Sequence, residues 1–164
     1  MAVTADIART WRRPGQVLSG LLGQGAREDR ALMYLMTGCA LVFVAQWPRL
    51  ARVAALTEVG LDRLIGYEVL AWLFVWPLAF YVLAGALWAL LRLVRLRISA
   101  FAVRLALFWG WLAATPAALL YGLQVGLNGY GPGAHVLGLL WLGAVLLFWG
   151  AGLGAALRAR PAQG

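Results

Sequence analysis

The sequence predicts an all-α protein: a polytopic membrane helical bundle of four transmembrane helices, preceded by an N-terminal amphipathic interfacial helix. Of its 164 residues, 63% are hydrophobic and only 12% are charged, whereas a soluble domain carries roughly a quarter charged residues. The apolar residues gather in long stretches, and a helix needs about twenty of them to cross a bilayer. Arginines flank these stretches, where they set membrane orientation and meet anionic lipid head groups.

Residues 1–30 are predicted to form a cytoplasmic amphipathic segment followed by a polar hinge. Apolar residues recur at helical spacing between Ile7 and Leu22. The arginines of this segment fall largely on the other side: Arg9, Arg12 and Arg13. Pro14 is expected to interrupt or kink the helix, because proline lacks an N–H and clashes with the preceding turn. We expect the apolar face to enter the lipid boundary while the arginines meet phosphate. The alternative is a helix packed on the protein's own cytoplasmic face.

The four predicted spans are residues 31–47, 66–91, 98–124 and 134–157. Residues 158–164 are the predicted cytoplasmic tail. The first span is slightly short and ends at Pro48, so helix must continue back through Arg30 and local bilayer thinning must absorb the mismatch. Pro77 and Pro116 lie mid-span, where they are expected to kink their helices and free carbonyl groups that neighbours must satisfy. Residues 49–64 are expected to form a short helix in the outer interface.

The distribution of arginines predicts the orientation, because arginine-rich loops stay in the cytoplasm. If four helices cross, most arginines lie on one side: Arg9, Arg12, Arg13, Arg27, Arg30, Arg92, Arg95, Arg97, Arg104, Arg158 and Arg160. The other side has Arg49, Arg52 and Arg63, which Glu58 and Asp62 offset. Both termini are therefore predicted to be cytoplasmic. All basic residues are arginine, a bias typical of a GC-rich bacterial genome, so we expect the bacterial inner membrane.

Glu68 is the first candidate functional residue, because a carboxylate in hydrocarbon is costly and usually functional. It lies near the outer end of the second span. Arg104 begins the third span near the inner surface, where its stem can snorkel toward the head groups, so the two are not expected to pair. Residues expected at the level of Glu68 are Tyr67, Gln124, Asn128, Tyr130 and His135. Either they form a small outward polar pocket with Glu68, or Glu68 is interfacial and simply hydrated.

Helix packing is predicted from small residues, which let helix backbones approach closely. Gly150 and Gly154 form a small-xxx-small pair in the fourth span, and Gly122 and Gly126 form another at the end of the third. In the fourth span the pair is expected to serve packing inside the bundle, with dimerisation as the alternative. The nine tryptophans suit interfacial belts, although several must also fill the bundle.

Several function classes lack the residues that they need. Cys39 is the single cysteine, which excludes an intrachain disulfide, and His135 is the single histidine, which leaves a metal site without a second soft ligand. The sequence has no nucleophile–base pair and no paired intramembrane carboxylates, so neither an enzyme nor a cofactor is predicted. The net charge of +8 does not indicate nucleic-acid binding, because the arginines edge apolar stretches instead of forming a patch on a soluble fold.

The N-terminal segment ARTWRRPGQVLSGLL, with its proline, precedes a compact set of hydrophobic spans. In this layout, residues 8 to about 157 resemble the bacterial branch of the Yip family, the Ypt-interacting membrane proteins. In eukaryotic relatives the resemblance implies five spans and a cytosolic N-terminal region that contacts Rab-type GTPases. This sequence departs from that pattern in its four predicted spans and its short N-terminal region. Its GYGPG at 129–133 is similar to a family motif but lies in a late outer loop, so that role is not carried over.

These observations favour a non-enzymatic bacterial inner-membrane protein that binds or organises another membrane component or lipid. Its expected partners are anionic head groups of the bilayer and another membrane protein. The alternative is a transporter or channel-like subunit with an outward-facing polar site around Glu68 and His135. A conduction path needs polar groups along the depth of several helices, and the interiors of the first and fourth spans have almost none.

Overall fold

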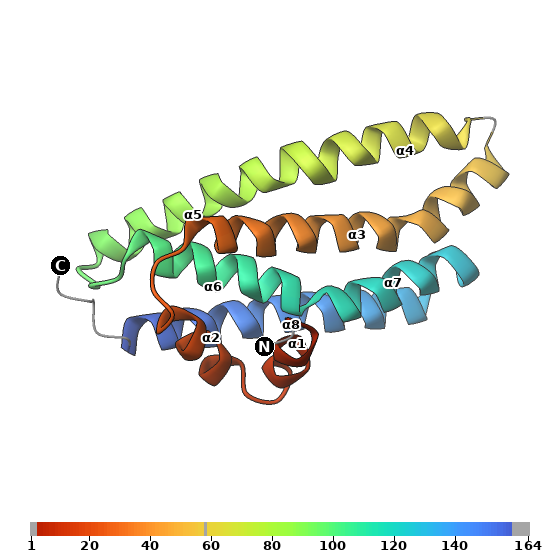
Figure 1. The fold of residues 1–164 in the computed structure, drawn as a ribbon. Coiled ribbons are helices and arrows are strands. Elements are labelled where there is room, and N and C mark those ends of the chain that lie inside the picture. Colours follow the sequence, from red (N-terminus) through yellow and green to blue (C-terminus); the bar gives the residue numbers. More distant parts are fainter. Residues whose placement is uncertain (1–2, 58, 159–164) are drawn as a thin grey trace.

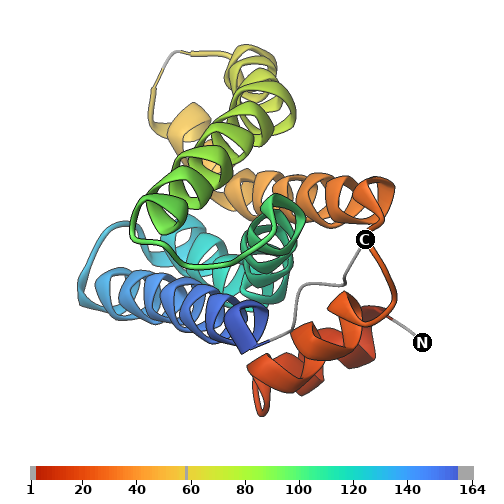
Figure 2. The ribbon, with the colours of Figure 1, turned by 90° about the vertical axis from the view of Figure 1, so that its left-hand side faces the viewer.

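The computed structural model describes residues 3–57 and 59–158, and all regular structure within them is helical. Long helices run alongside one another in alternating directions, with two short N-terminal helices against one flank (Figures 1 and 2). The all-α prediction is therefore confirmed. Glu58, Arg160 and the rest of the predicted tail beyond Arg158 lie outside the described residues.

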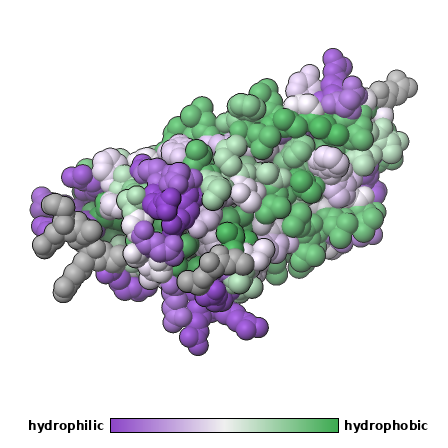
Figure 3. Space-filling view, viewed as in Figure 1, coloured by the Kyte–Doolittle hydropathy of each residue, from purple (hydrophilic) through white to green (hydrophobic). Residues whose placement is uncertain are grey.

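Within the described part of the chain, three helices are long and apolar enough to cross a membrane: Glu28–Leu56, Leu61–Leu93 and Pro132–Arg158. A bent pair, Ala100–Ala113 with Thr115–Asn128, makes a fourth candidate if the pair is one span. Large apolar side chains on these helices point outward, with Phe74, Leu78 and Leu139 exposed by 66%, 67% and 69%. On the face drawn in Figure 3, hydrophobic side chains cover the long middle, and hydrophilic ones gather toward the two ends and around the N-terminal helices. This combination is typical of a membrane protein.

The N-terminal segment consists of α1 (Val3–Thr10) and α2 (Pro14–Leu22). Pro14 does not kink a continuous helix. It stands at the start of α2, where its missing N–H costs no hydrogen bond and its fixed φ suits the first turn. Leu18 and Leu21 are buried, and α2 packs along α8. The expectation that this apolar face enters the lipid boundary is therefore wrong for these two side chains, which instead cover the protein's own helices.

The first long helix, α3 (Glu28–Leu56), continues through Pro48. The expected end at residue 47 and the separate interfacial helix over 49–64 are both wrong: residues 49–56 extend α3, and α4 (Leu61–Leu70) begins after a short connection. A proline inside a helix removes one hydrogen bond, but neighbouring helices in a bundle make it tolerable. Here Pro48 lies directly against Gly126 of α7, and Leu50 beyond it is buried.

The second long helix, Leu61–Leu93, widens locally just before Pro77. Between α4 and α5 (Trp76–Leu93), residues Ala71–Val75 form a π-helical turn, η1, and Pro77 follows at the start of α5. The Trp76 amide bonds the Ala71 carbonyl, five residues back, in this turn. π-turns often occur at functional sites, and here Trp72 and Trp76 project from it.

The predicted kink at Pro116 is confirmed as a 42° bend between α6 (Ala100–Ala113) and α7 (Thr115–Asn128). The carbonyl groups freed there find partners, as expected. The Thr115 hydroxyl donates to the Leu112 carbonyl at 2.8 Å, and the indole N–H of Trp11 donates to the Ala113 carbonyl at 2.9 Å. A second indole, Trp109, donates to the hydroxyl of Thr10 at 3.1 Å. The N-terminal segment is thus tied to the bend.

The glycines of α7 permit the closest helix contact in the bundle core. A Cβ on Gly122 would lie 1.8 Å from the Ala45 carbonyl oxygen, and one on Gly126 would lie 2.1 Å from the Pro48 Cβ. The pair in α8 (Pro132–Arg158) differs: a Cβ on Gly150 would meet nothing within 4 Å, and one on Gly154 would meet only the Arg158 guanidinium at 3.7 Å. Within the described residues, close packing therefore uses the α7 pair and leaves the α8 pair open.

Replacing Gly122 with alanine should separate α3 from α7. We expect a loss of about 1–3 kcal/mol of unfolding free energy, the usual cost of overpacking. Cys39 is fully buried and is the single cysteine, so its reaction with a maleimide dye on heating reports unfolding. Gly150→Ala, which has open space, is the matched control. Equal unfolding temperatures for the two variants would contradict the role assigned to the α3–α7 contact.

Candidate functional site

The structure gives Glu68 partners other than those expected. Its Oε1 accepts from Arg49 Nη2 at 2.5 Å, and its Oε2 accepts from Trp72 Nε1 at 2.8 Å. Arg49 Nε also donates to Gln46 Oε1 at 2.8 Å. The result is a chain of four side chains from Gln46 to Trp72, in which the carboxylate is paired instead of simply hydrated.

The predicted polar pocket around Glu68 does not form among the described residues. Gln124 and Asn128 do meet, with the Asn128 amide donating to Gln124 Oε1 at 3.0 Å, but on α7 and not at Glu68. Tyr67 is 64% exposed and Tyr130 is 71% exposed. His135 lies exposed in the first turn of α8. Residues adjacent along a helix point about 100° apart, which places Tyr67 on a different face from Glu68.

Sequence reasoning missed Arg49 and Gln46 because it ended the first helix at residue 47. Once α3 continues past Pro48, Arg49 lies beside α4 and reaches Glu68. The contact with Trp72 had a usable signal, since residues four apart on a helix are neighbours. The expectation that Arg104 does not meet Glu68 holds: Arg104 forms a two-point ion pair with Glu28, and it does not simply extend toward head groups.

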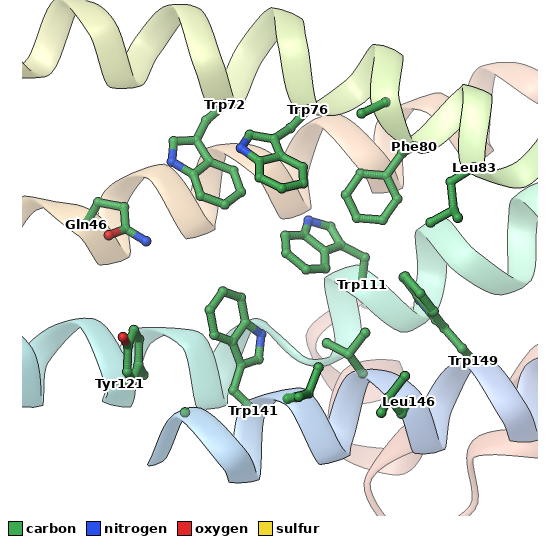
Figure 4. A pocket seen from close by; sticks show the side chains of 14 residues that line it. Gln46, Trp72, Trp76, Phe80, Leu83, Trp111, Tyr121, Trp141, Leu146 and Trp149 are labelled. Atoms are coloured by element: carbon green, nitrogen blue, oxygen red, sulfur yellow. The ribbon is translucent and has the colours of Figure 1, made fainter. Parts of the chain in front are cut away.

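An apolar cavity of about 690 Å³ has the shape of a binding site (Figure 4). Ligand pockets for small molecules range over about 300–1,000 Å³. Its lining comes from α3, η1, α5, α6, α7 and α8: Gln46, Trp72, Trp76, Ala79, Phe80, Leu83, Trp111, Tyr121, Gly138, Trp141, Leu142, Val145, Leu146 and Trp149. Leu83, Leu142 and Leu146 are themselves exposed, so the cavity opens sideways between α5 and α8.

Flat aromatic faces dominate the cavity. The Trp72 and Trp76 rings stack at 5.2 Å with planes 17° apart, and Trp72 and Trp111 stack at 6.2 Å with planes 16° apart. Trp141 faces Trp111 at 5.7 Å from the opposite wall. The π-turn places the first two indoles, and Gly38 makes room for the third, because a Cβ there would lie 2.7 Å from the Trp111 ring. The site therefore presents nearly parallel surfaces suited to a flat molecule.

Two indole N–H groups in this lining have no hydrogen-bond partner. The Nε1 atoms of Trp111 and Trp141 are buried and unpaired within the described residues, and Trp111 Nε1 lies against α3 at Gly38, so these donors are shielded from the open space of the cavity. By contrast, the indole of Trp149 donates to the Leu107 carbonyl at 3.0 Å. Leaving a buried donor without a partner costs about 1–3 kcal/mol. Such an orphan is rare in a folded protein, and it calls for an explanation.

Gln46 supplies the hydrogen-bond donor that turns into the cavity. Its oxygen accepts from Arg49, so its amide nitrogen is the end that turns into the cavity, as Figure 4 shows. Among the described residues that line the cavity, none carries a charge. The cavity can therefore hold a neutral molecule that accepts hydrogen bonds.

Comparisons with protein-family models, with curated proteins and with solved structures give no match for this chain. The description of the site therefore rests on its geometry.

The effects of mutating Arg49 and Glu68 on stability should be coupled, because the two side chains form an ion pair. Glu68→Met leaves the half-buried guanidinium without its counter-charge and removes the acceptor of Trp72, and we expect a loss of about 1–3 kcal/mol of unfolding free energy. In the Glu68→Met background, Arg49→Met should lower the unfolding free energy by less than it does in the unmodified protein, because the ion pair is already lost. Cys39 reactivity on heating measures both, with the exposed Tyr67→Phe as control. Strictly additive losses would show that the pair contributes no mutual stabilisation.

Proposed function

We propose that this protein is a non-enzymatic membrane protein that binds a neutral, lipid-soluble compound in the aromatic cavity between α5 and α8. The observation that carries the proposal is an apolar cavity with aromatic walls, into which the amide nitrogen of Gln46 turns. A bound molecule with an acceptor oxygen would satisfy that donor, and its apolar part would cover the indole faces. In this proposal, the predicted binding of a membrane component takes place in the aromatic cavity.

The position of the opening supports a ligand that arrives through the bilayer. The cavity opens on the flank of the bundle, and the side chains at its rim are aliphatic. A lipid-soluble molecule can enter there without crossing a water-filled path. An uncharged lining matches a neutral ligand, because burying an unpaired charge is prohibitively costly.

We place four spans across the membrane, with the bent α6–α7 pair as the third and both termini in the cytoplasm. Support comes from the alternating helix directions and from the arginines at the end where α3 begins and α8 ends: Arg27, Arg30, Arg92, Arg95, Arg97 and Arg158. Arg12 and Arg13 follow Trp11, which bonds the mid-span Ala113 carbonyl, so their exposed side chains would extend along the bundle to reach anionic head groups. The bacterial inner membrane and membership of the Yip family belong to the same proposal.

The transporter alternative around Glu68 and His135 has less support. Glu68 is neutralised by Arg49, and His135 is exposed at the start of α8, where it forms no hydrogen bond or ion pair with Glu68 among the described residues. A carboxylate held in an ion pair is poorly suited to bind and release a cation. The lateral cavity offers a better-defined site.

A ring placed in the cavity should block binding. Ala79 lines the cavity and is exposed, so Ala79→Phe adds a ring there with little strain on the core. With the whole protein in detergent, energy transfer from tryptophan to the apolar dye diphenylhexatriene should saturate for the unmodified chain and should not for Ala79→Phe. Ala89→Phe, on the same helix but outside the cavity, is the control. Identical energy transfer for the unmodified chain and both variants would show that the dye does not bind in the cavity.

Cysteine labelling tests the membrane placement. In a Cys39→Ala background, a cysteine at Tyr130, in the connection before α8, should react with an impermeant maleimide in intact spheroplasts. A cysteine at Leu96, in the connection before α6, should react only after the membrane is opened. Labelling of both positions from the same side would mean that α6 and α7 form a re-entrant loop and that the four-span placement is wrong.

A further inference from the structure

The amide of Gln46 is oriented by its neighbours and not by the cavity. Arg49 can only donate hydrogen bonds, so the atom that it contacts at 2.8 Å must be the amide oxygen of Gln46. Glu68 holds the guanidinium from the other side at 2.5 Å. With its oxygen occupied, Gln46 presents its NH₂ group to the cavity (Figure 4).

Every side-chain nitrogen in the lining is consequently a donor, because the others belong to indoles. The one that turns into the cavity is the Gln46 amide. In the lining, only the Tyr121 hydroxyl can also accept. A complementary ligand must carry acceptors, and a carbonyl oxygen is the acceptor that brings no hydrogen of its own.

The walls define the shape of the ligand. The near-parallel indoles of Trp72, Trp76 and Trp111 provide flat, electron-rich faces. Flat rings pack on such faces, and an electron-poor ring gains further from them. The aliphatic rim between α5 and α8 can accommodate a hydrocarbon chain that extends into the bilayer.

We infer that the ligand is a lipid-soluble quinone, a class defined by a planar, electron-poor ring with carbonyl oxygens and a long hydrocarbon tail. One carbonyl oxygen accepts from the Gln46 amide, the ring lies among the indoles, and the tail leaves through the lateral opening. Gln46 is then the residue that determines specificity, and Arg49 positions it. The inference rests on the proposed function and adds the chemical class of the ligand.

Other membrane compounds match the cavity less well. A phospholipid would bring its charged head group against a lining that, within the described residues, contains no charge. A plain hydrocarbon would fill the volume and leave the Gln46 amide without an acceptor. The hydrocarbon corresponds to a distinct outcome of the following measurement.

The test uses the whole protein in nanodiscs of phosphatidylcholine. A benzoquinone with a decyl tail is titrated while tryptophan fluorescence is followed, because a bound quinone quenches nearby indoles. We expect saturable quenching, with decylbenzene, which has the tail but no carbonyl, as a poor competitor. Gln46→Met should weaken the affinity about fivefold, the factor expected for one hydrogen bond.

Gln124→Met is the matched control, since Gln124 bonds Asn128 on α7 outside the cavity lining. Cys39 reactivity on heating verifies that each variant is folded. If decylbenzene competes as well as the quinone, or if folded Gln46→Met binds the quinone unchanged, the quinone assignment is wrong while binding in the cavity stands. If neither compound binds saturably and diphenylhexatriene transfer is insensitive to Ala79→Phe, the proposed function itself fails.

Discussion

The close approach of α3 and α7 is the constraint on which the rest of the arrangement depends. It exists because Gly122 and Gly126 present bare backbone to Ala45 and Pro48. With that contact, α3 stays helical beyond its proline and remains beside the bundle. Its extension then carries Arg49 to Glu68 and turns the neighbouring glutamine toward the aromatic cavity. In a bilayer, such contacts replace the hydrophobic drive that packs helices in water.

A second constraint is the bend at Pro116. A proline removes one donor and displaces the helix that follows it, so carbonyl groups before it need new partners. One is satisfied locally by Thr115, and another by an indole from the N-terminal segment, Trp11. The bend thereby becomes an attachment point, and the buried bond between Trp109 and Thr10 reinforces it. The helix continues through Pro48, because Gly126 leaves room for the proline. It bends at Pro116, where hydrogen-bond donors satisfy the freed carbonyl groups.

The sequence was sufficient for features that depend on one residue and its near neighbours. Apolar length predicted the helical bundle, and the missing N–H predicted the bend at Pro116. It was insufficient where the outcome depended on a distant partner: whether Pro48 ends a helix depends on Gly126, and which residue pairs with Glu68 depends on how far α3 extends. The aromatic cavity was missed for the same reason: the sequence predicted that several tryptophans fill the bundle, but these tryptophans come from separate helices, and single positions do not show which of them meet.

The docking of α1 and α2 has a consequence for biosynthesis. These helices pack on α6 and α8, which the ribosome makes later, and α8 comes last among the described helices. Residues 3–22 therefore lack their final surface until α8 has been made. During that interval Leu18 and Leu21 have no protein to cover them, and we expect the apolar face of α2 to rest on a lipid surface. Lipid contact is then a stage in assembly, and the finished bundle replaces it.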